Sequence, residues 1–93
     1  MTYHNQCNIP NLDCMETSDL MMFWHASSDR ATARNLFPSR PKGYTRLAKD
    51  LGNYAANKAT AMSCRARGDI QTARSYEAIA ENIYRDLPYF ARW

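Results

Sequence analysis

The sequence predicts an all-α domain built on a long antiparallel helical hairpin. Its 93 residues suffice for one domain and include no valine, whereas alanine and other strong helix formers are abundant. No run alternates β-branched or aromatic residues with polar ones, as a half-buried strand would require. Two long stretches instead repeat apolar residues every three or four positions, which is the spacing of a helical face. Short helices before this hairpin and a turn after it complete the predicted fold.

The first part of the chain divides into an irregular N-terminal arm, residues 1–14, and the start of a single helical domain, residues 15–93. The arm is polar and carries asparagine at positions 5, 8 and 11. Thr17 or Ser18 can cap a first short helix, in which Asp19 faces the positive end of the helix dipole. The apolar residues expected to share one face of this helix are Leu20, Phe23 and Trp24.

A second short helix and a loop follow. Ser27 or Ser28 can cap this helix, which we expect to continue through Leu36. The stretch FPSRPKG then ends it, because each proline disfavours helical backbone in the residue before it. Gly43 adds a further break, so this stretch is the clearest loop of the chain.

Residues 44–67, YTRLAKDLGNYAANKATAMSCRAR, predict the first long helix of the hairpin. Its apolar positions follow one helical face: Leu47, Ala48, Leu51, Ala55, Ala59, Met62 and Ala66. Gly52 lies inside this helix, where glycine costs about 1 kcal/mol relative to alanine. That cost is tolerable if a neighbouring element packs closely against Gly52.

Arg67, Gly68 and Asp69 form a tripeptide that adhesion receptors recognise in secreted proteins, but here it coincides with a helix boundary. Glycine can adopt positive φ and end a helix, and aspartate can cap the next one. The next helix, residues 69–86, is followed by a turn that begins at Pro88. Its seam positions have the spacing of an antiparallel helix pair: Ala73, Tyr76, Ala80, Ile83 and Leu87. The aromatic residues expected to fold back onto the hairpin are Tyr89, Phe90 and Trp93.

Charge is unevenly distributed along the chain. The formal charge is −4 for residues 1–29, +8 for residues 30–67 and −1 for residues 68–93, within an overall +3. The central block is basic enough to attract nucleic acid or an acidic protein. It can equally pair with the acidic first segment of the same chain.

Nothing in the sequence indicates catalysis. It contains neither a glycine-rich phosphate-binding loop nor a nucleophile elbow, so we expect no enzymatic activity and no cofactor. The possible zinc ligands are too loosely spaced for a structural site: His4, Cys7, Cys14 and His25. We therefore expect no metal site, and we interpret Cys64 as a small buried hydrophobic residue of the long helix.

The sequence favours a cytoplasmic protein. The N-terminus lacks the basic start and apolar stretch of a signal peptide, and no run of ~20 apolar residues is present that could span a membrane. The three cysteines are an odd number and cannot form a complete set of disulfides, which favours a reducing compartment.

Two resemblances extend this reading. GDIQTARSYEAIAENIY, residues 68–84, resembles the second helix of a tetratricopeptide unit, with glycine and an acidic residue at the turn and small or aromatic residues at the packing positions. A single unit of this kind implies a tight helical hairpin, since such repeats need about three copies to bury a continuous core. Residues 40–79 and the closing LPYFARW also resemble a group of small uncharacterised proteins of bacteriophages and environmental sequences. This second resemblance implies a phage-encoded protein that acts in an infected bacterial host.

The favoured function is non-enzymatic binding of a host protein. The chain has two Trp, six Tyr, three Phe and five Met, more than so small a domain can bury, and such residues are enriched at interface cores. The expected contact surface joins a basic loop and helix start with nearby aromatic residues: Phe37, Arg40, Lys42, Tyr44, Arg46, Lys49 and Trp93. Nucleic acid is the alternative partner, because the same cations can contact phosphates and Tyr44 can stack on a base. Homodimerisation through the hairpin is a further possibility.

Overall fold

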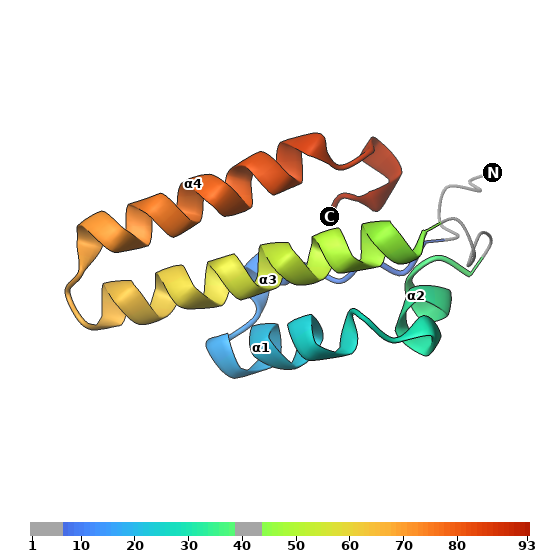
Figure 1. Cartoon of the computed structure of the whole chain (residues 1–93), viewed down its shortest axis with the longest axis horizontal. Helices are drawn as coiled ribbons and strands as arrows, with labels where there is room; N and C mark the ends of the chain where they lie inside the picture. The colour runs from blue at the N-terminus through green and yellow to red at the C-terminus, as the bar shows by residue number, and fades with distance from the viewer. Residues whose placement is uncertain (1–6, 39–43) are drawn as a thin grey trace.

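The computed structural model confirms an all-α fold and describes residues 7–38 and 44–93 (Figure 1). The helices are α1 (Thr17–Ala26), α2 (Arg30–Leu36), α3 (Thr45–Ala66) and α4 (Ile70–Asp86). One 3-10 turn precedes α1 and another follows α4: η2 (Leu12–Cys14) and η3 (Tyr89–Ala91). Helices α3 and α4 form the predicted long antiparallel hairpin, and α1 packs on a different side of α3.

The corner of the hairpin is built as predicted, with Gly68 ending α3 and Asp69 capping α4. Gly68 has a φ of 85°, a conformation that L side chains rarely adopt. The backbone N–H of Asp69 donates to the carbonyl of Cys64 at 2.9 Å and closes the end of α3. The Asp69 carboxylate then accepts from the backbone N–H of Thr72 at 3.2 Å and caps α4. The tripeptide that begins at Arg67 is therefore the link between two helices.

Small side chains fill the contact between α3 and α4. Ala73 and Ala80 of α4 are buried, as are Ala61 and Cys64 of α3, so the two backbones approach closely. Ala66 was predicted to belong to the apolar face of α3, but this prediction is wrong. It is the last residue of the helix and lies exposed beside the turn, where no element covers it.

The other side of α3 receives α1 at Gly52. A Cβ atom added to Gly52 would collide with both Oγ and Cβ of Ser27, which directly follows α1. Ser27 is 4% exposed, and its hydroxyl donates to the carbonyl of Trp24 at 2.6 Å. The expectation that a close neighbour makes Gly52 tolerable is confirmed.

Residues 7–14, which were expected to form part of an irregular arm, pack against the helices in the structure. Leu12 of η2 is fully buried and belongs to the hydrophobic core. The backbone N–H of Asn8 donates to the carbonyl of Leu36 at 2.9 Å, and its side chain donates to the carbonyl of Asn35 at 2.8 Å. The predicted helix caps are also displaced, because the cap positions are occupied by Glu16 before α1 and by Asp29 before α2.

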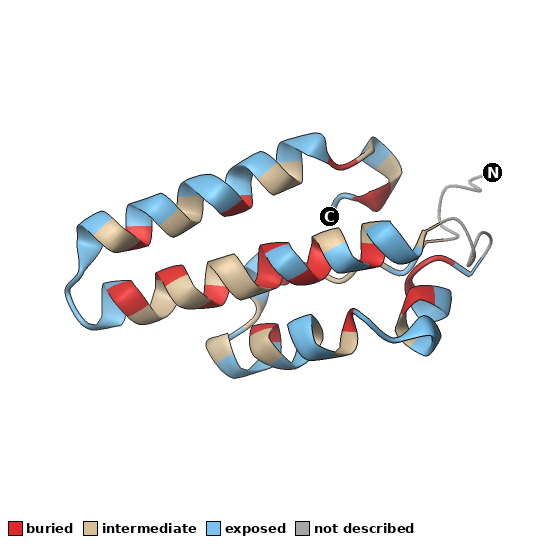
Figure 2. Cartoon of the chain, in the orientation of Figure 1, coloured by how far each residue is buried: buried red, intermediate tan, exposed pale blue. Residues whose placement is uncertain are grey.

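The two faces of α3 differ in how they are covered. In Figure 1, α3 lies between α4 and α1, and the segment that leads into α1 passes behind it. The core lies on this covered side, where Leu51 and Ala55 are fully buried. Arg46, Lys49 and Asn53 are exposed and follow one another by about one helical turn, so they share one side of α3, which we call its open face. Figure 2 shows exposed stretches of ribbon toward the N-terminal end of α3.

Candidate macromolecule-binding surface

Two of the predicted contact residues, Arg46 and Lys49, lie on this open face of α3. Both are exposed, and they occupy the first two turns of the helix. Two others, Arg40 and Lys42, lie outside the described residues. The N-terminal part of α3 thus carries two exposed cations of the predicted surface.

The aromatic part of the predicted surface is corrected. Phe37 is 1% exposed and belongs to the core, so it cannot contact a partner. Its ring packs edge-on against Tyr44, with ring centroids 5.1 Å apart, and against Phe90 at 6.5 Å. Tyr44 is half-buried by the same cluster. The domain therefore uses these rings for its own packing, where the sequence count had suggested a surplus for an interface.

Trp93 is also engaged within the molecule. Its indole lies against the rings of Tyr54 and Tyr84, each with a centroid separation of 4.7 Å. Its Nε1–H donates to Asp13 Oδ2 at 3.0 Å. Tyr54 lies five residues after Lys49, hence about 140° around the axis of α3. The structure therefore places Trp93 away from the side of α3 that carries Lys49.

Asp13 is the residue whose importance the sequence did not reveal. Its carboxylate accepts the hydroxyl of Tyr54 at 2.6 Å in addition to the indole of Trp93, and Lys58 Nζ lies 3.4 Å away. Partial burial raises the pKa of Asp13, but these two hydrogen bonds and the charge of Lys58 together outweigh it and hold the pKa below its ordinary value. No sequence signal could have joined residues 13, 54 and 93, which are distant in the chain.

The pKa of Tyr54 is shifted in the opposite direction from that of Asp13. Desolvation first, and the neighbouring Asp13 carboxylate second, raise the pKa of Tyr54 far above its ordinary value. The phenol therefore remains a hydrogen-bond donor to Asp13 throughout the neutral range. This Asp13 cluster ties the segment before α1, helix α3 and the end of the chain together, and its function is structural.

An open groove beside the Asp13 cluster is lined by Lys58, Glu77 and Glu81, each of which forms an ion pair. Arg65 binds Glu77 through two hydrogen bonds, of 2.5 and 2.9 Å, and these bonds hold the pKa of Glu77 below its ordinary value. Glu81 lies 3.5 Å from Arg85 one turn later. Pairing of this kind is typical of a solvated helix surface, and it leaves little charge of one sign for a ligand.

Arg46 and Lys49, the cations of the open face, differ from the paired charges of this groove. Within residues 7–38 and 44–93, neither Arg46 nor Lys49 forms an ion pair. Arg46 lies in the first turn of α3, where the positive end of the helix dipole disfavours cations, and Lys49 follows in the second turn. The charges of these two side chains are therefore not used in ion pairs within the described part of the chain.

Possible metal ligands do not gather in the part of the chain that the structure describes. Among them, no group of three or more His, Cys, Asp or Glu side chains could hold a metal ion, and His4 lies outside them. Burial raises the pKa of the Cys7 thiol, which disfavours a reactive thiolate. Cys64 is buried and accepts a hydrogen bond from Arg67 at 3.4 Å.

No family model, no curated protein and no solved structure matches this chain. None of the described helices is both long enough and apolar enough to cross a membrane. The functional assignment therefore rests on the chemistry of the open face of α3.

Proposed function

We propose that this protein is a small non-enzymatic interaction protein that binds an acidic surface of a protein partner through the open face of α3. The observation that carries the proposal is the pair of exposed cations, Arg46 and Lys49, which have no described ion-pair partner; Arg46 also lies in the first turn of α3, where the helix dipole disfavours a cation. Clustered cations attract acidic partners and accelerate their association.

The shape of the molecule favours a protein over the groove of a nucleic acid. The domain measures 44 × 23 × 19 Å, and α3 lies between α1 and α4. The major groove of DNA is about 12 Å wide and admits a single protruding helix. Helix α3 cannot enter such a groove without its neighbours, so a nucleic acid could be contacted only through its phosphates. Phosphate binding by the same surface remains the alternative function.

The resemblance to phage-encoded proteins suggests where the partner is to be found. Small phage proteins commonly bind and redirect a protein of the infected bacterium, so we propose a bacterial host protein as the partner and the host cytoplasm as the location. These two assignments rest on the resemblance alone.

A pull-down from nuclease-treated bacterial lysate tests the proposal. The bait is the tagged wild-type protein, compared with the charge-reversed variant Arg46→Glu/Lys49→Glu. The matched control, Arg34→Glu/Arg74→Glu, makes the same change of charge at exposed positions on α2 and α4. Circular dichroism checks that all three proteins are folded.

We expect wild type and control to retain a stoichiometric host protein that the Arg46→Glu/Lys49→Glu variant loses. Retention by all three proteins would refute the assignment of the surface. If no protein is retained but nucleic acid is recovered without nuclease, the alternative replaces the proposal. In that case the affinity should fall steeply and log-linearly with salt, as expected for phosphate contacts.

A further inference from the structure

One side of α4 carries no charged residue before the last turn of the helix. It is centred on Ile79, which is 45% exposed. The other residues of this side stand three, four or seven positions from Ile79, so they surround it on the helix surface: Thr72, Ser75, Tyr76, Asn82 and Ile83. We call this set, together with Ile79, the uncharged face of α4. Within the described part of the chain, the main packing partner of α4 is α3, and α4 forms one edge of the molecule (Figure 1).

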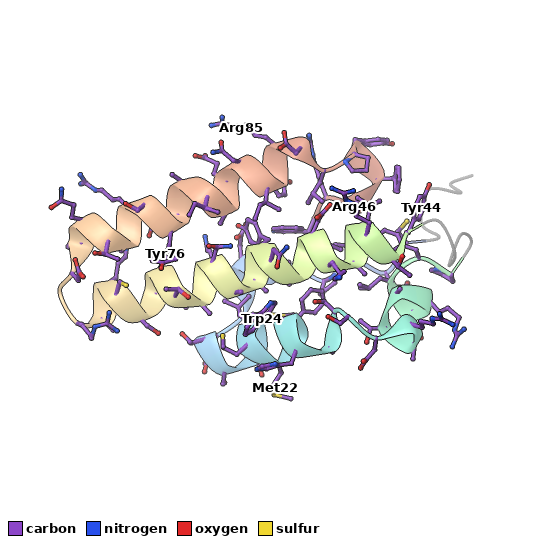
Figure 3. All side chains as sticks on the ribbon, viewed as in Figure 1. Met22, Trp24, Tyr44, Arg46, Tyr76 and Arg85 are labelled. Atoms are coloured by element: carbon purple, nitrogen blue, oxygen red, sulfur yellow. The ribbon has the colours of Figure 1, made fainter. Side chains whose placement is uncertain are left out.

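The charges in the body of α4 lie on a different side. Arg74, Glu77, Glu81 and Arg85 follow one another at intervals of three or four residues and therefore share that side. Ile79 is two residues from both Glu77 and Glu81, which places it about 160° from each around the helix axis. In Figure 3, Arg85 extends away from the molecule, whereas Tyr76 lies on the side of α4 toward α3. The exposed side chain of Ile79 is therefore surrounded on α4 by uncharged residues.

The two ends of the uncharged face differ in polarity. Asp86, the last residue of α4, stands seven positions after Ile79, is exposed and forms no ion pair with the described residues. At the other end, the first turn of α4 contains no acidic residue and carries the positive end of the helix dipole. The formal charges of Arg67 and the capping Asp69, which precede this turn, cancel. The face thus has a neutral centre between a negative end and a positive end.

We propose that the uncharged faces of two copies of this chain pack against each other, with their α4 helices antiparallel and Ile79 at the two-fold axis. A two-fold interface uses the same surface on both copies, so a face with one negative and one positive end is complementary to itself. Asp86 of one copy then lies opposite Thr72 of the partner subunit, in the first turn of that helix, where a carboxylate is favourable. A neutral centre opposes no like charges at the axis, and it offers nothing to attract an acidic or a basic partner.

This self-association goes beyond the proposed function and is independent of it. Arg46 and Lys49 belong to α3 and not to the uncharged face, so a dimer would carry two open faces. The contact is formed by one helix of 17 residues, about 25 Å long, and is smaller than a standard stable interface. We therefore expect a weak dimer with a dissociation constant on the order of 100 µM.

Sedimentation equilibrium of the purified protein tests the inference. Wild type should change from monomer toward dimer as its concentration rises from about 5 to about 500 µM, on either side of the expected dissociation constant. Ile79→Lys places two like charges at the axis and should remain monomeric throughout. The matched control, Ile70→Lys, makes the same change at an isoleucine that is 38% exposed and lies on the opposite side of α4, nine residues away. It should dimerise as wild type does, and circular dichroism checks that both variants are folded.

A charge exchange tests the antiparallel arrangement. Asp86→Lys places a cation opposite the positive end of the partner's helix twice in each dimer, so it should weaken dimerisation roughly tenfold. Adding Thr72→Glu should restore the affinity, because the new lysine of each copy then lies opposite the new glutamate of the other. Failure of this restoration would refute the antiparallel pairing.

A wild type that is monomeric at every concentration would overturn the inference. So would a dimer that Ile79→Lys retains, or one that Ile70→Lys loses as well. None of these results bears on the proposed function, which is judged by the capture of a host protein through Arg46 and Lys49 on another helix.

Discussion

The contact between Gly52 and Ser27 makes a sharp prediction about stability. In an exposed helix, replacing glycine by alanine should stabilise the protein by about 1 kcal/mol. Here the new methyl group would collide with Oγ and Cβ of Ser27, which is 4% exposed and hydrogen-bonded to Trp24. Because Cβ is attached directly to the backbone, α1 has to shift as a whole.

The magnitude of this effect follows from three contributions. Overpacking costs typically 1–3 kcal/mol, and we take the upper part of that range because the backbone must move. Loss of the Ser27–Trp24 hydrogen bond adds about 1 kcal/mol, and the helix propensity of alanine offsets a similar amount. Gly52→Ala should therefore lower the free energy of unfolding by about 2 kcal/mol. For a domain of this size that lowers Tm by roughly 8–16 °C.

A double-mutant cycle measured by urea denaturation tests the cause. In a Ser27→Gly background the collision is removed, and the nearest remaining atom is the Trp24 carbonyl oxygen at an ordinary 3.5 Å. Gly52→Ala should then stabilise the protein by about 1 kcal/mol, so its sign reverses. Ser28→Gly, at the exposed neighbouring position, should leave the destabilisation intact. An equal effect of Gly52→Ala in all three backgrounds would refute the reasoning.

Three further predictions concern the Asp13 cluster, acid stability and the hairpin corner. Asp13→Asn removes the ion pair with Lys58 and leaves one acceptor oxygen for Tyr54 and Trp93. The free energy of unfolding, measured by urea denaturation, should therefore fall by about 1 kcal/mol. Unchanged stability would show that the cluster does not hold the end of the chain. The pKa values of Asp13 and Glu77 are lowered in the folded state, so these two carboxylates stabilise the fold when they are ionised. This stabilisation is fully present above the carboxyl pKa of the unfolded chain, about 4, and is lost as the pH falls through the lower pKa of the folded state. Thermal unfolding between pH 6 and pH 2 should show this loss, smaller in Asp13→Asn, and a variant with the same acid profile as wild type would contradict it. Gly68→Ala forces alanine to a φ of 85°, so the free energy of unfolding should fall by about 1–2 kcal/mol. Gly68→Asn should lose less, because asparagine tolerates this conformation better. Equal stability of the wild type and both variants would exclude strain at this position.

Local signals in the sequence were enough to predict the hairpin. The spacing of Ala73, Tyr76 and Ala80 set the face of α4, and the glycine–aspartate pair at 68 and 69 set its beginning. Such features act within one or two turns of helix, where neighbours in sequence are neighbours in space. The long helix was likewise predicted to within one residue at each end.

Features that depend on distant parts of the chain could not be predicted in this way. The segment before α1 carries polar residues typical of an arm, yet Leu12 reaches the core and Asp13 finds Tyr54 and Trp93. The same long-range packing buries Phe37, which composition alone assigned to a surface. Arg46 and Lys49 were identified because exposed charge on a helix follows from sequence directly.

Site-specific photo-crosslinking tests the central claim, that a partner binds the open face of α3. A benzophenone amino acid is placed at Asn53, which is exposed one turn after Lys49, and at Ser75 on the surface of α4 as the matched control. Irradiation in nuclease-treated bacterial lysate should link a host protein from position 53 and not from position 75. Crosslinks only from position 75, or none from position 53, would contradict the claim.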